Sequence, residues 1–411
     1  MQSSVQGQFI MTEKHFKLGL FGFGCVGQGL YDVLNHSQGL KADIEKICVK
    51  DHTKKRKIDS NYFTYDKEEI LGRKNLDAIV ELIDNSKDAY EIVSRALGNG
   101  IDVVTANKKM LAENFESLYQ LQEKNNVALI YEGSAGGSIP IIRNLEEYYD
   151  NELLSSIRGL LNGSCNYILT CMELEHMDYS KALEMAQKYG FAESDPWLDV
   201  AGYDTLYKLV LLTVHAFGII LKPEQVLTLG IQNISFDDIT YAREKGLRIK
   251  LIATAHKVGD KFRVYAMPHF VSKESDLYNV LYENNGVEVE GAYSCKQTFV
   301  GKGAGSHPTG SAVLSDISAL TYHYKYGYKK LKKLRQLYHG SFDGGTFLDE
   351  DFNIKVYIRF SDKKDLFGIE VVSIEEEFKS AKTNYIVANV KFKSLFRLKG
   401  NAESKVFVCV V

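Results

Sequence analysis

A glycine-rich turn near the N-terminus constrains the fold of this chain more than any other feature. The apolar run Lys17–Phe21 predicts a buried strand, and an amphipathic stretch with apolar residues at helical spacing follows the turn. Between them lies Gly22-Phe23-Gly24-Cys25-Val26-Gly27, a G-x-G-x-x-G turn in the strand–turn–helix setting that this motif needs. The glycines allow the tight turn, the approach of a pyrophosphate and the packing of helix on strand. We therefore expect a dinucleotide to bind at the N-terminus of this helix.

The segments that follow alternate between strand and helix patterns. Strands are predicted at 44–49, 76–83, 102–105 and 127–131, and helices at 86–97, 111–124 and 139–149. This alternation predicts an α/β Rossmann domain with a doubly wound parallel sheet over residues 15–143. The N-terminal sequence MQSSVQGQFIMTEKHF lacks the apolar core of a signal peptide, so we expect a short disordered lead, with Met11 as an alternative start.

Charged residues follow the second predicted strand. Asp51 stands where an acidic residue binds the ribose hydroxyls of NAD. Lys50, Lys54, Lys55 and Arg56 crowd the same turn, and cations there suit the 2′-phosphate of NADP. A solvated basic loop explains the last three cations individually just as well. The sequence thus predicts NAD or NADP as cofactor and leaves the choice open.

Composition and charge exclude several classes of function. The net charge is −3, with no basic excess to attract nucleic acid or an acidic membrane surface. No apolar run approaches the length of a membrane span. The six cysteines are scattered without a C-x-x-C pair, which argues against a disulfide framework or structural zinc and favours a reducing cytoplasm.

The pattern changes near residue 151, where a second domain is predicted over 144–300. Its expected elements are strands at 156–161, 249–255, 262–266 and 295–299, a helix near Tyr167 after a polar turn, and a helix from about Gly202. They suggest a second α+β domain with one sheet. A second glycine-rich turn leads into a helix at 309–320, so residues 301–325 are expected to return to the cofactor domain. A connector at 322–338 and a small α+β tail at 345–411, with strands at 352–360, 385–392 and 406–411, complete the prediction.

An acidic loop leads into the apolar helix near residue 202. It contains Glu193 and Asp199, and the helix places Asp204 and Lys208 on one face because they are four residues apart. Charges at the mouth of a buried helix must be paired or neutralised, an arrangement common in active sites. A solvated loop with one surface ion pair explains the same residues equally well.

Two further polar segments follow predicted strands. Lys108 comes just after the 102–105 strand and is expected to point into the ligand crevice, although an isolated lysine there is more often an ordinary surface residue. Glu132 precedes the glycine-rich stretch 133–140, which can expose several carbonyl groups. One carboxylate with carbonyls suits a hard cation such as sodium, and a plain turn explains the stretch as well.

Six segments together resemble the homoserine dehydrogenases, in the family's order, over about residues 17–320. They are GFGCVG, TANKK, YEGSAGGSIPII, GLLNGSCNYILT, YGFAESDPWLDVAGYDTLYKL and GKGAGSHPTGSAVLSDI. The resemblance implies a reversible, NAD(P)-dependent interconversion of L-homoserine and L-aspartate 4-semialdehyde, on the route to threonine and methionine. It also implies a homodimer or homotetramer, and the chain lacks an aspartate kinase segment.

The resemblance assigns roles to matching positions of this sequence. Lys208 would give or take the hydroxyl proton beside Lys108, with Asp204 orienting Lys208 and contacting the substrate. Glu193, with Asp199 close by, would bind the substrate ammonium group. The implied cofactor contacts are Gly22, Gly24, Cys25, Val26, Gly27, Lys50, Asp51, Thr105, Lys108, Gly190 and Gly305. The implied sodium ligands are Glu132 and the carbonyls of Ala135, Gly137 and Ile139. We also expect the two lysines to lower each other's pKa, because like charges disfavour the charged form.

Two features depart from the family pattern. Asp84-Asn85 replaces the usual Gly-Gly after the third long strand, where an acidic group is expected to disturb the nicotinamide ribose or alter the cofactor preference. The tail resembles only the first strand of an ACT domain, without its glycine-led loop and first helix. We interpret it as a truncated or diverged ACT-like module, which leaves threonine feedback open.

Two alternative functions compete with this interpretation. A semialdehyde dehydrogenase needs a cysteine nucleophile, and Cys165 lies in a polar turn without a recognisable nucleophile motif. A non-catalytic NAD(P) sensor would use the fold for binding alone, and the presence of both Lys108 and Lys208 argues against it.

Overall fold

Six parallel strands form the N-terminal sheet of the computed structural model, which describes residues 15–151, 153–340, 343–380 and 383–411. They are β1 (Phe16–Phe21), β2 (Ala42–Cys48), β3 (Phe63–Thr64), β4 (Ala78–Glu81), β5 (Asp102–Thr105) and β6 (Leu129–Ile130). Their order, β3-β2-β1-β4-β5-β6, confirms the predicted doubly wound Rossmann sheet. Residues 1–14, which hold most of the predicted lead and Met11, lie outside the described part of the chain.

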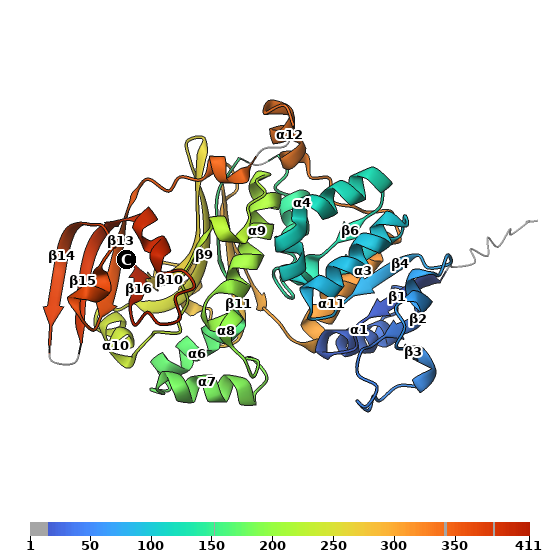
Figure 1. Cartoon of the computed structure of the whole chain (residues 1–411), viewed down its shortest axis with the longest axis horizontal. Coiled ribbons are helices and arrows are strands. Elements are labelled where there is room, and N and C mark those ends of the chain that lie inside the picture. Colours follow the sequence, from blue (N-terminus) through green and yellow to red (C-terminus); the bar gives the residue numbers. More distant parts are fainter. Residues whose placement is uncertain (1–14, 152, 341–342, 381–382) are drawn as a thin grey trace, which may run out of the picture.

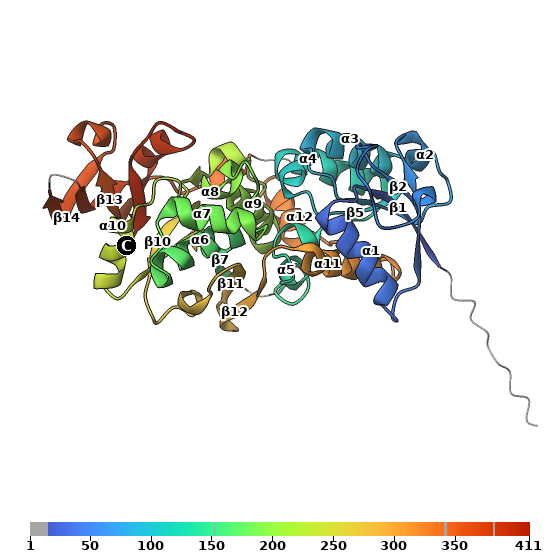
Figure 2. The same ribbon diagram turned by 90° about the horizontal axis from the view of Figure 1, so that it is seen from below.

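This half of the molecule also contains helices α1 (Cys25–His36), α2 (Glu68–Leu71), α3 (Ser86–Gly98), α4 (Lys108–Asn125) and α5 (Ile141–Glu146) (Figure 1 and Figure 2). Asparagine side chains define where two of them begin. Asn85 Oδ1 accepts hydrogen bonds from Lys87 N and Asp88 N, and Asn107 Oδ1 accepts one from Met110 N. Such caps satisfy amides that would otherwise lack a partner. Helix α4 therefore starts at Lys108, three residues earlier than the predicted start at residue 111.

A segment distant in sequence, α11 (Ser306–Leu320), packs directly on α1. Ser306 Oγ donates a hydrogen bond of 2.8 Å to Cys25 O. At the point where the two helices cross, only glycine fits, because there is no room for a Cβ atom. A Cβ on Gly29 would lie 2.0 Å from Ser306 O, and one on Gly310 would lie 2.6 Å from Gly29 C. The polypeptide thus returns beside the glycine-rich turn after passing through the second half of the molecule.

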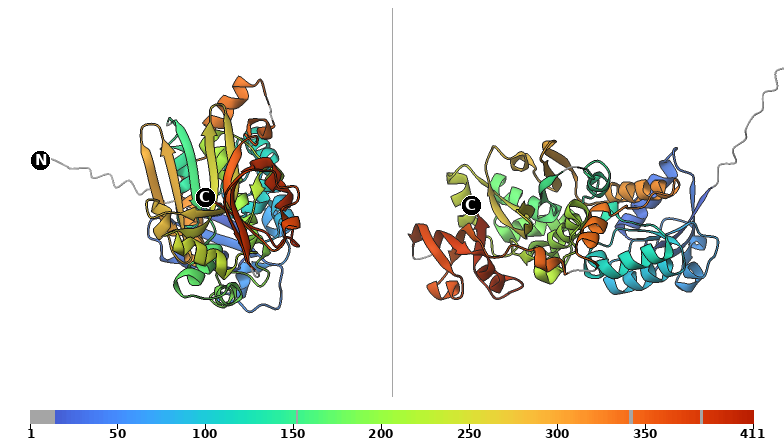
Figure 3. Two further views of the ribbon diagram at one scale, coloured as in Figure 1. Left: turned by 90° about the vertical axis from the view of Figure 1, so that its left-hand side faces the viewer. Right: turned by 90° about the horizontal axis from the view of Figure 1, so that it is seen from above.

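The second half contains one large mixed sheet. Its strands are β7 (Leu154–Leu160), β8 (Leu227–Thr228), β9 (Arg248–Val258), β10 (Lys261–Val271), β11 (Asn284–Gly291), β12 (Cys295–Lys302), β13 (Asn353–Phe360), β14 (Val371–Lys379), β15 (Asn384–Lys391) and β16 (Phe407–Val410). The order is β12-β11-β7-β9-β10-β16-β13-β15-β14, with β8 beside β10. Figure 3 shows these strands side by side. A Rossmann sheet with a second, mixed sheet agrees with the predicted fold class.

The tail strands extend this sheet, because β16 pairs with β10 at Val410 and His269. In Figure 2 they lie at the opposite end of the molecule from β1 and β2. Strand β14 was not predicted. It is largely exposed and carries three consecutive glutamates, so it lacks the clear alternation of a half-buried strand. The described residues of the tail contain 3₁₀ turns and no α-helix, in keeping with the missing first helix of an ACT domain.

Helix α9 (Tyr203–Phe217) lies between the two sheets, beside α4 and against β9 (Figure 1). Every residue from Asp204 to Phe217 is buried. The remaining helices are α6 (Gly163–Leu174), α7 (Tyr179–Lys188), α8 (Trp197–Val200), α10 (Phe236–Glu244) and α12 (Lys329–Leu337). No helix of the described residues is long and apolar enough to cross a membrane. The burial of α9 fixes the charged residues near its N-terminus at the junction of the two halves.

Candidate active site

Two lysines from different halves of the molecule meet at one carboxylate. Lys208 Nζ donates hydrogen bonds to Asp204 Oδ2 at 2.7 Å and to Leu161 O at 2.6 Å. Lys108, the first residue of α4, places its Nζ 2.9 Å from Asp204 Oδ1. Asp204 and Lys208 are 6% and 7% exposed, whereas the Lys108 side chain is 38% exposed. Asp204 therefore bridges a buried lysine and a more accessible one.

This arrangement separates the pKa values of the two lysines. Burial lowers the pKa of Lys208, and the nearby charge of Lys108 lowers it further, against the opposing effect of Asp204. The carboxylate of Asp204 raises the pKa of Lys108 and outweighs burial there, with help from Asp199 and Glu193. Burial alone would raise the pKa of Asp204, but the two lysines bring it below its ordinary value. The pKa of Lys208 is therefore lowered, as expected, whereas the net shift of Lys108 is upward because the Asp204 carboxylate outweighs the effects that lower it.

Asn162, which the sequence analysis did not single out, joins the two carboxylates. Its Nδ2 donates to Asp199 Oδ1 at 2.7 Å and to Asp204 Oδ2 at 2.8 Å. Its Oδ1 accepts from Cys165 N and caps α6, which begins four residues before the predicted start. Burial, reinforced by Asp204, raises the pKa of Asp199 to about 6. An asparagine just before an apolar helix is a typical N-cap, and this pattern could have drawn attention to Asn162 in the sequence.

Cys165 is fully buried behind this cluster. Burial raises the pKa of its thiol well above the ordinary value, and Asp199 and Asp204 add to that effect. Because the thiolate is the nucleophilic form of cysteine, this environment argues against the alternative of a semialdehyde dehydrogenase with a cysteine nucleophile.

The loop before α8 carries Glu193, which is exposed. Its carboxylate has no hydrogen bond or ion pair to another described residue, although its charge contributes to the raised pKa of Lys108. The backbone around it is held in place: Gln187 Nε2 donates to Glu193 O at 2.9 Å, and Ser164 Oγ donates to Phe191 O. Gly190 lies in the same loop with a positive φ of 77°. An accessible carboxylate thus lies near Lys108.

The glycine-rich turn has the geometry that its motif predicts. Gly22 has a φ of +94°, and a Cβ there would lie 2.6 Å from Leu82 O. A Cβ on Gly27 would lie 2.5 Å from Gly22 O, so this residue sets the approach of α1 to β1. A Cβ on Gly24 would meet nothing within 4 Å. The space in front of the α1 N-terminus is therefore open, as a bound pyrophosphate requires. Gly305 is the residue immediately before α11, whose first residue, Ser306, donates a hydrogen bond to Cys25 O of the turn.

The charged residues in the turn after β2 form hydrogen bonds mainly with other residues of the same turn. Asp51 Oδ1 accepts hydrogen bonds from Thr53 N, Thr53 Oγ1 and Lys54 N, and these bonds lower the pKa of the carboxyl. Arg56 donates to the carbonyls of Asp51 and Lys54 and lies over the ring of Phe63. Lys50 is exposed. The carboxylate predicted to select NAD therefore has local partners already.

A buried pair that the sequence analysis missed lies beneath the cofactor side of the sheet. Thr105 Oγ1 donates to Glu81 Oε2 at 2.5 Å, and Ile83 N donates to Glu81 Oε1 at 2.7 Å. Asn107 N in turn donates to Thr105 Oγ1. Both Glu81 and Thr105 are 0% exposed, so the Thr105 side chain is not available to a cofactor. The network instead fixes the residues that precede Lys108.

This pair predicts a pH-dependent stability. Burial raises the pKa of Glu81 from 4.5 to about 7. Between these values the folded protein keeps a proton that the unfolded chain has lost, so folding stability falls as the pH rises through this window. Glu81→Gln should remove this dependence, a difference of about 3 kcal/mol. Denaturant unfolding of both proteins at about pH 4 and about pH 8 measures it. If the free energy of unfolding changes equally with pH in the wild type and in Glu81→Gln, the prediction is contradicted, since the two proteins share every other buried group.

The segment predicted to bind sodium begins with a buried glutamate. Glu132 is 2% exposed, and its two carboxylate oxygens accept hydrogen bonds of 2.8 Å from Ile142 N and Arg143 N at the start of α5. Its pKa is raised by burial, and the Arg143 Nε atom lies 3.9 Å away. Ile139 O already accepts from Ile141 N, and Ala135 is buried. A cation would compensate this desolvated carboxylate, so the residues fit the predicted ion. No cluster of three acidic, histidine or cysteine side chains for a metal occurs in the described residues.

Comparisons with known proteins agree on one family. Two family models match: "Homoserine dehydrogenase" over residues 140–318 and "Homoserine dehydrogenase, NAD binding domain" over residues 22–132. Homoserine dehydrogenase of Bacillus subtilis is 33% identical over 323 residues, which cover 76% of this chain and 75% of that protein. The crystal structure of a homoserine dehydrogenase from Thiobacillus denitrificans gives a TM-score of 0.77 at 26% identity, over 97% of this chain and 98% of that one. A hyperthermophilic archaeal homoserine dehydrogenase mutant in complex with NADPH gives 0.66 at 25% identity, over 76% and 100%.

Proposed function

Because this chain belongs to the homoserine dehydrogenase family, and is therefore an NAD(P)-dependent oxidoreductase, we propose that Lys208, Lys108 and Asp204 carry out the proton transfer of its reaction. The observation that carries this proposal is the bridge that Asp204 makes between the two lysines. Homoserine-dependent reduction of NAD or NADP by the purified chain, compared with that of Lys208 variants, tests it.

Lys208 has the properties of a general base for homoserine oxidation. Two of its three possible hydrogen bonds go to Asp204 and Leu161, which fixes the direction of the third. Its lowered pKa increases the fraction of neutral amine near neutral pH. In the oxidation of homoserine, the neutral amine takes the hydroxyl proton while the carbinol hydride leaves. The bound dinucleotide supplies the hydride acceptor in this direction and the hydride donor in the other.

Lys108 has the complementary role. Asp204 keeps it charged, and its side chain is partly exposed at the start of α4. A fixed ammonium group next to the reacting oxygen stabilises negative charge that develops there. The same two lysines act in the reverse reaction, in which Lys208 returns its proton to the oxygen of the reduced semialdehyde.

The acidic groups suit the amino group of the substrate. We assign the substrate ammonium to Glu193, whose carboxylate is exposed and has no partner among the described residues, with Asp199 nearby. Asp204 contacts the substrate from the lysine side. Carboxylates are the natural partners of an ammonium ion.

We propose that NADP(H) is the preferred cofactor. The Asp51 carboxylate is engaged by Thr53 and Lys54, which weakens it as a ribose ligand and leaves Lys50 as an exposed cation at the end of β2. The related archaeal enzyme was solved with NADPH. Gly22, Gly24, Cys25, Val26 and Gly27 would hold the pyrophosphate, with Gly190 and Gly305 as further backbone contacts to the cofactor. Asp84 lies in the turn after β4, where we expect it to influence the nicotinamide ribose.

The cofactor assignment predicts a change in selectivity. Lys50→Ala should lower kcat/KM for NADP about tenfold and change kcat/KM for NAD much less, because only NADP carries the 2′-phosphate. Initial rates with both cofactors at saturating homoserine measure the ratio. Lys46→Ala is the matched control, since Lys46 lies within β2, a few residues before Lys50, and its Nζ donates to Asn61 O. Equal losses with both cofactors would contradict the assignment.

We propose a structural sodium ion held by Glu132 and the carbonyls of Ala135, Gly137 and Ile139. Replacing sodium in the buffer by tetramethylammonium should lower the Tm of the wild type by several degrees, because an ion that binds only the folded state stabilises it. Glu132→Gln should show no difference between the two salts. The proposal fails if the wild-type Tm is the same in both.

We further propose a homodimer, or a tetramer built from it, in the cytoplasm. Strand β12 is the last strand of its sheet and exposes Val300, and the β11–β12 hairpin exposes Tyr293, at 59% and 80%. Such an edge favours contact between copies.

All six cysteines are free thiols, which suits a reducing compartment. Light scattering on the purified chain would test the assembly. The proposed domains are 15–143 with 301–325, 144–300, and 345–411, whose strands continue the sheet of the second domain through β16.

A further inference from the structure

A buried asparagine shares a hydrogen-bond acceptor with Lys208. Asn285 lies on β11 and is 0% exposed, in the row of that strand that otherwise carries the core residues Val287 and Val289. Its Nδ2 donates to Leu161 O at 3.1 Å. The same oxygen accepts from Lys208 Nζ at 2.6 Å. One carbonyl oxygen therefore separates the Asn285 amide from the amine proposed as general base.

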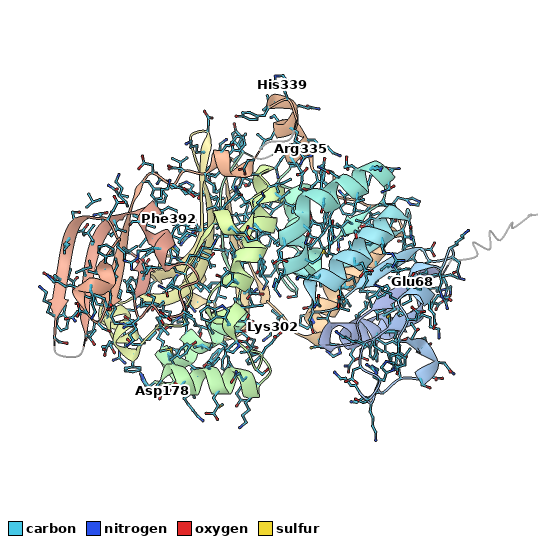
Figure 4. All side chains as sticks on the ribbon, in the orientation of Figure 1. Glu68, Asp178, Lys302, Arg335, His339 and Phe392 are labelled. Carbon is cyan, nitrogen blue, oxygen red and sulfur yellow. The ribbon has the colours of Figure 1, made fainter. Side chains whose placement is uncertain are left out.

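The other side of Asn285 touches the second glycine-rich turn. A Cβ on Gly303 would lie 2.1 Å from Asn285 Cγ, 2.2 Å from Oδ1 and 2.3 Å from Nδ2. These nearly equal distances show that the face of the amide covers Gly303. The turn continues through Gly305 into α11, which packs on α1 beside the cofactor turn. Figure 4 shows the neighbouring Lys302 between the two halves of the molecule. Asn285 thus connects the lysine with the segment that returns to the cofactor.

The amide oxygen of Asn285 is buried and has no hydrogen-bond partner among the described residues. A buried acceptor without a partner costs free energy, and an apolar residue of similar size would avoid that cost. The amide cannot be rotated to exchange its two ends, because Oδ1 would then face the oxygen of Leu161. The polar side chain is therefore retained at a cost that packing alone does not explain.

We propose that Asn285 is a positioning residue for Lys208, holding the Leu161 carbonyl that orients the lysine amine and coupling it to the glycine-rich turn 301–305. This inference rests on the proposed role of Lys208. The charged and titratable groups around that amine are Asp204 on the same helix, Lys108 on α4, Asp199 on α8 and Cys165 on α6. None of them lies on β11, so a charge introduced at Asn285 approaches the lysine from a side that has none.

The experiment introduces a carboxylate at this position. Asn285→Asp replaces the amide nitrogen that donates to Leu161 O by a carboxylate oxygen, so the variant loses the hydrogen bond that holds this carbonyl. The negative charge of the carboxylate also favours the protonated form of Lys208. The pH at which kcat/KM for homoserine oxidation rises should then move upward by about one unit. At any fixed pH below this rise, kcat/KM of the variant should be about tenfold lower than that of the wild type. Asn284→Asp is the matched control. The adjacent side chain of a strand points to the opposite face, and Asn284 bonds to Leu281 O, so its profile should stay unchanged. An unmoved profile in folded Asn285→Asp, or an equal shift in the control, would overturn the proposal.

A second variant keeps the proposal testable if the aspartate protein does not fold. Asn285→Ala should lower kcat about tenfold, because Lys208 loses the group that fixes its acceptor, and should leave the cofactor Kd within about twofold. Cofactor fluorescence measures the Kd without turnover. Unchanged kcat, or equal losses in kcat and cofactor affinity, would contradict a positioning role. If Lys208→Ala is inactive but the Asn285 variants have the activity of the wild type, only the role of Asn285 is rejected. If Lys208→Ala is active, the proposed role of Lys208 in proton transfer is rejected as well.

Discussion

Lys208→Ala is expected to lower kcat for homoserine oxidation about a thousandfold, because it removes the group that takes the hydroxyl proton. The variant should still bind the cofactor with a Kd close to that of the wild type. The buried amine of Lys208 bonds to Asp204 and Leu161, and neither belongs to the glycine-rich turn that would hold the pyrophosphate. Loss of the lysine should therefore leave that turn intact. Steady-state rates and cofactor fluorescence titration on the same preparation give the two numbers.

Lys109→Ala is the control for this experiment. Lys109 is the neighbour of Lys108, and its Nζ lies 3.9 Å from Glu113 on the exposed side of α4. A surface pair of this kind contributes little to stability, so kcat should stay within about twofold of the wild type. If Lys208→Ala loses cofactor affinity as strongly as turnover, the lysine is structural and its assigned role is wrong.

Asp204→Asn is expected to lower both turnover and stability. Asparagine cannot balance two ammonium groups, so Lys108 and Lys208 repel each other across the former bridge. Breaking a buried ion pair in this way costs about 3 kcal/mol of folding stability. We expect kcat to fall about a hundredfold, because Lys208 loses the partner that orients it. The pKa of Lys108, which Asp204 raises, should fall in the variant.

The stability difference between wild type and Asp204→Asn should depend on pH in a defined direction. The pKa of Asp204 lies below its ordinary value of 3.8 in the folded protein. A carboxylate with a lowered pKa stabilises the folded state fully above the unfolded pKa, and the stabilisation fades as the pH falls towards the folded pKa. Urea unfolding at a series of pH values should thus show a full difference near neutrality and a smaller one in acid. A difference that grows in acid would exclude the ion pair as its cause.

The sequence predicted the parts of the fold that depend on local periodicity. The strand–turn–helix around Gly22–Gly27 and the alternation after it were sufficient for the Rossmann sheet, because each element carries its own apolar pattern. Strands β3 and β8, with two residues each, are too short to show a pattern. Strand β14 is exposed, and the short basic helix α12 was taken for part of a connector.

The site was predictable only where residues lie close in sequence. The spacing of Asp204 and Lys208 placed them on one helix face, but the contact of Lys108 with Asp204 joins residues 96 positions apart. Only resemblance to the family suggested it. Polar residues such as Glu81 in β4 and Asn285 in β11 produce no periodic signal of a functional role. Their roles come from tertiary contacts, and so does the divergence of the two lysine pKa values.

The most direct test of the account is the pH dependence of homoserine oxidation by the unmodified chain, followed through the absorbance of the reduced nicotinamide. We expect turnover that requires L-homoserine, with kcat/KM rising through one ionisation below the ordinary lysine pKa of 10.5, because burial and Lys108 lower the pKa of Lys208. Parallel assays with added threonine would show whether the tail has a regulatory role. Cofactor binding without homoserine-dependent turnover at any pH would contradict the account and leave a protein that only binds NAD(P).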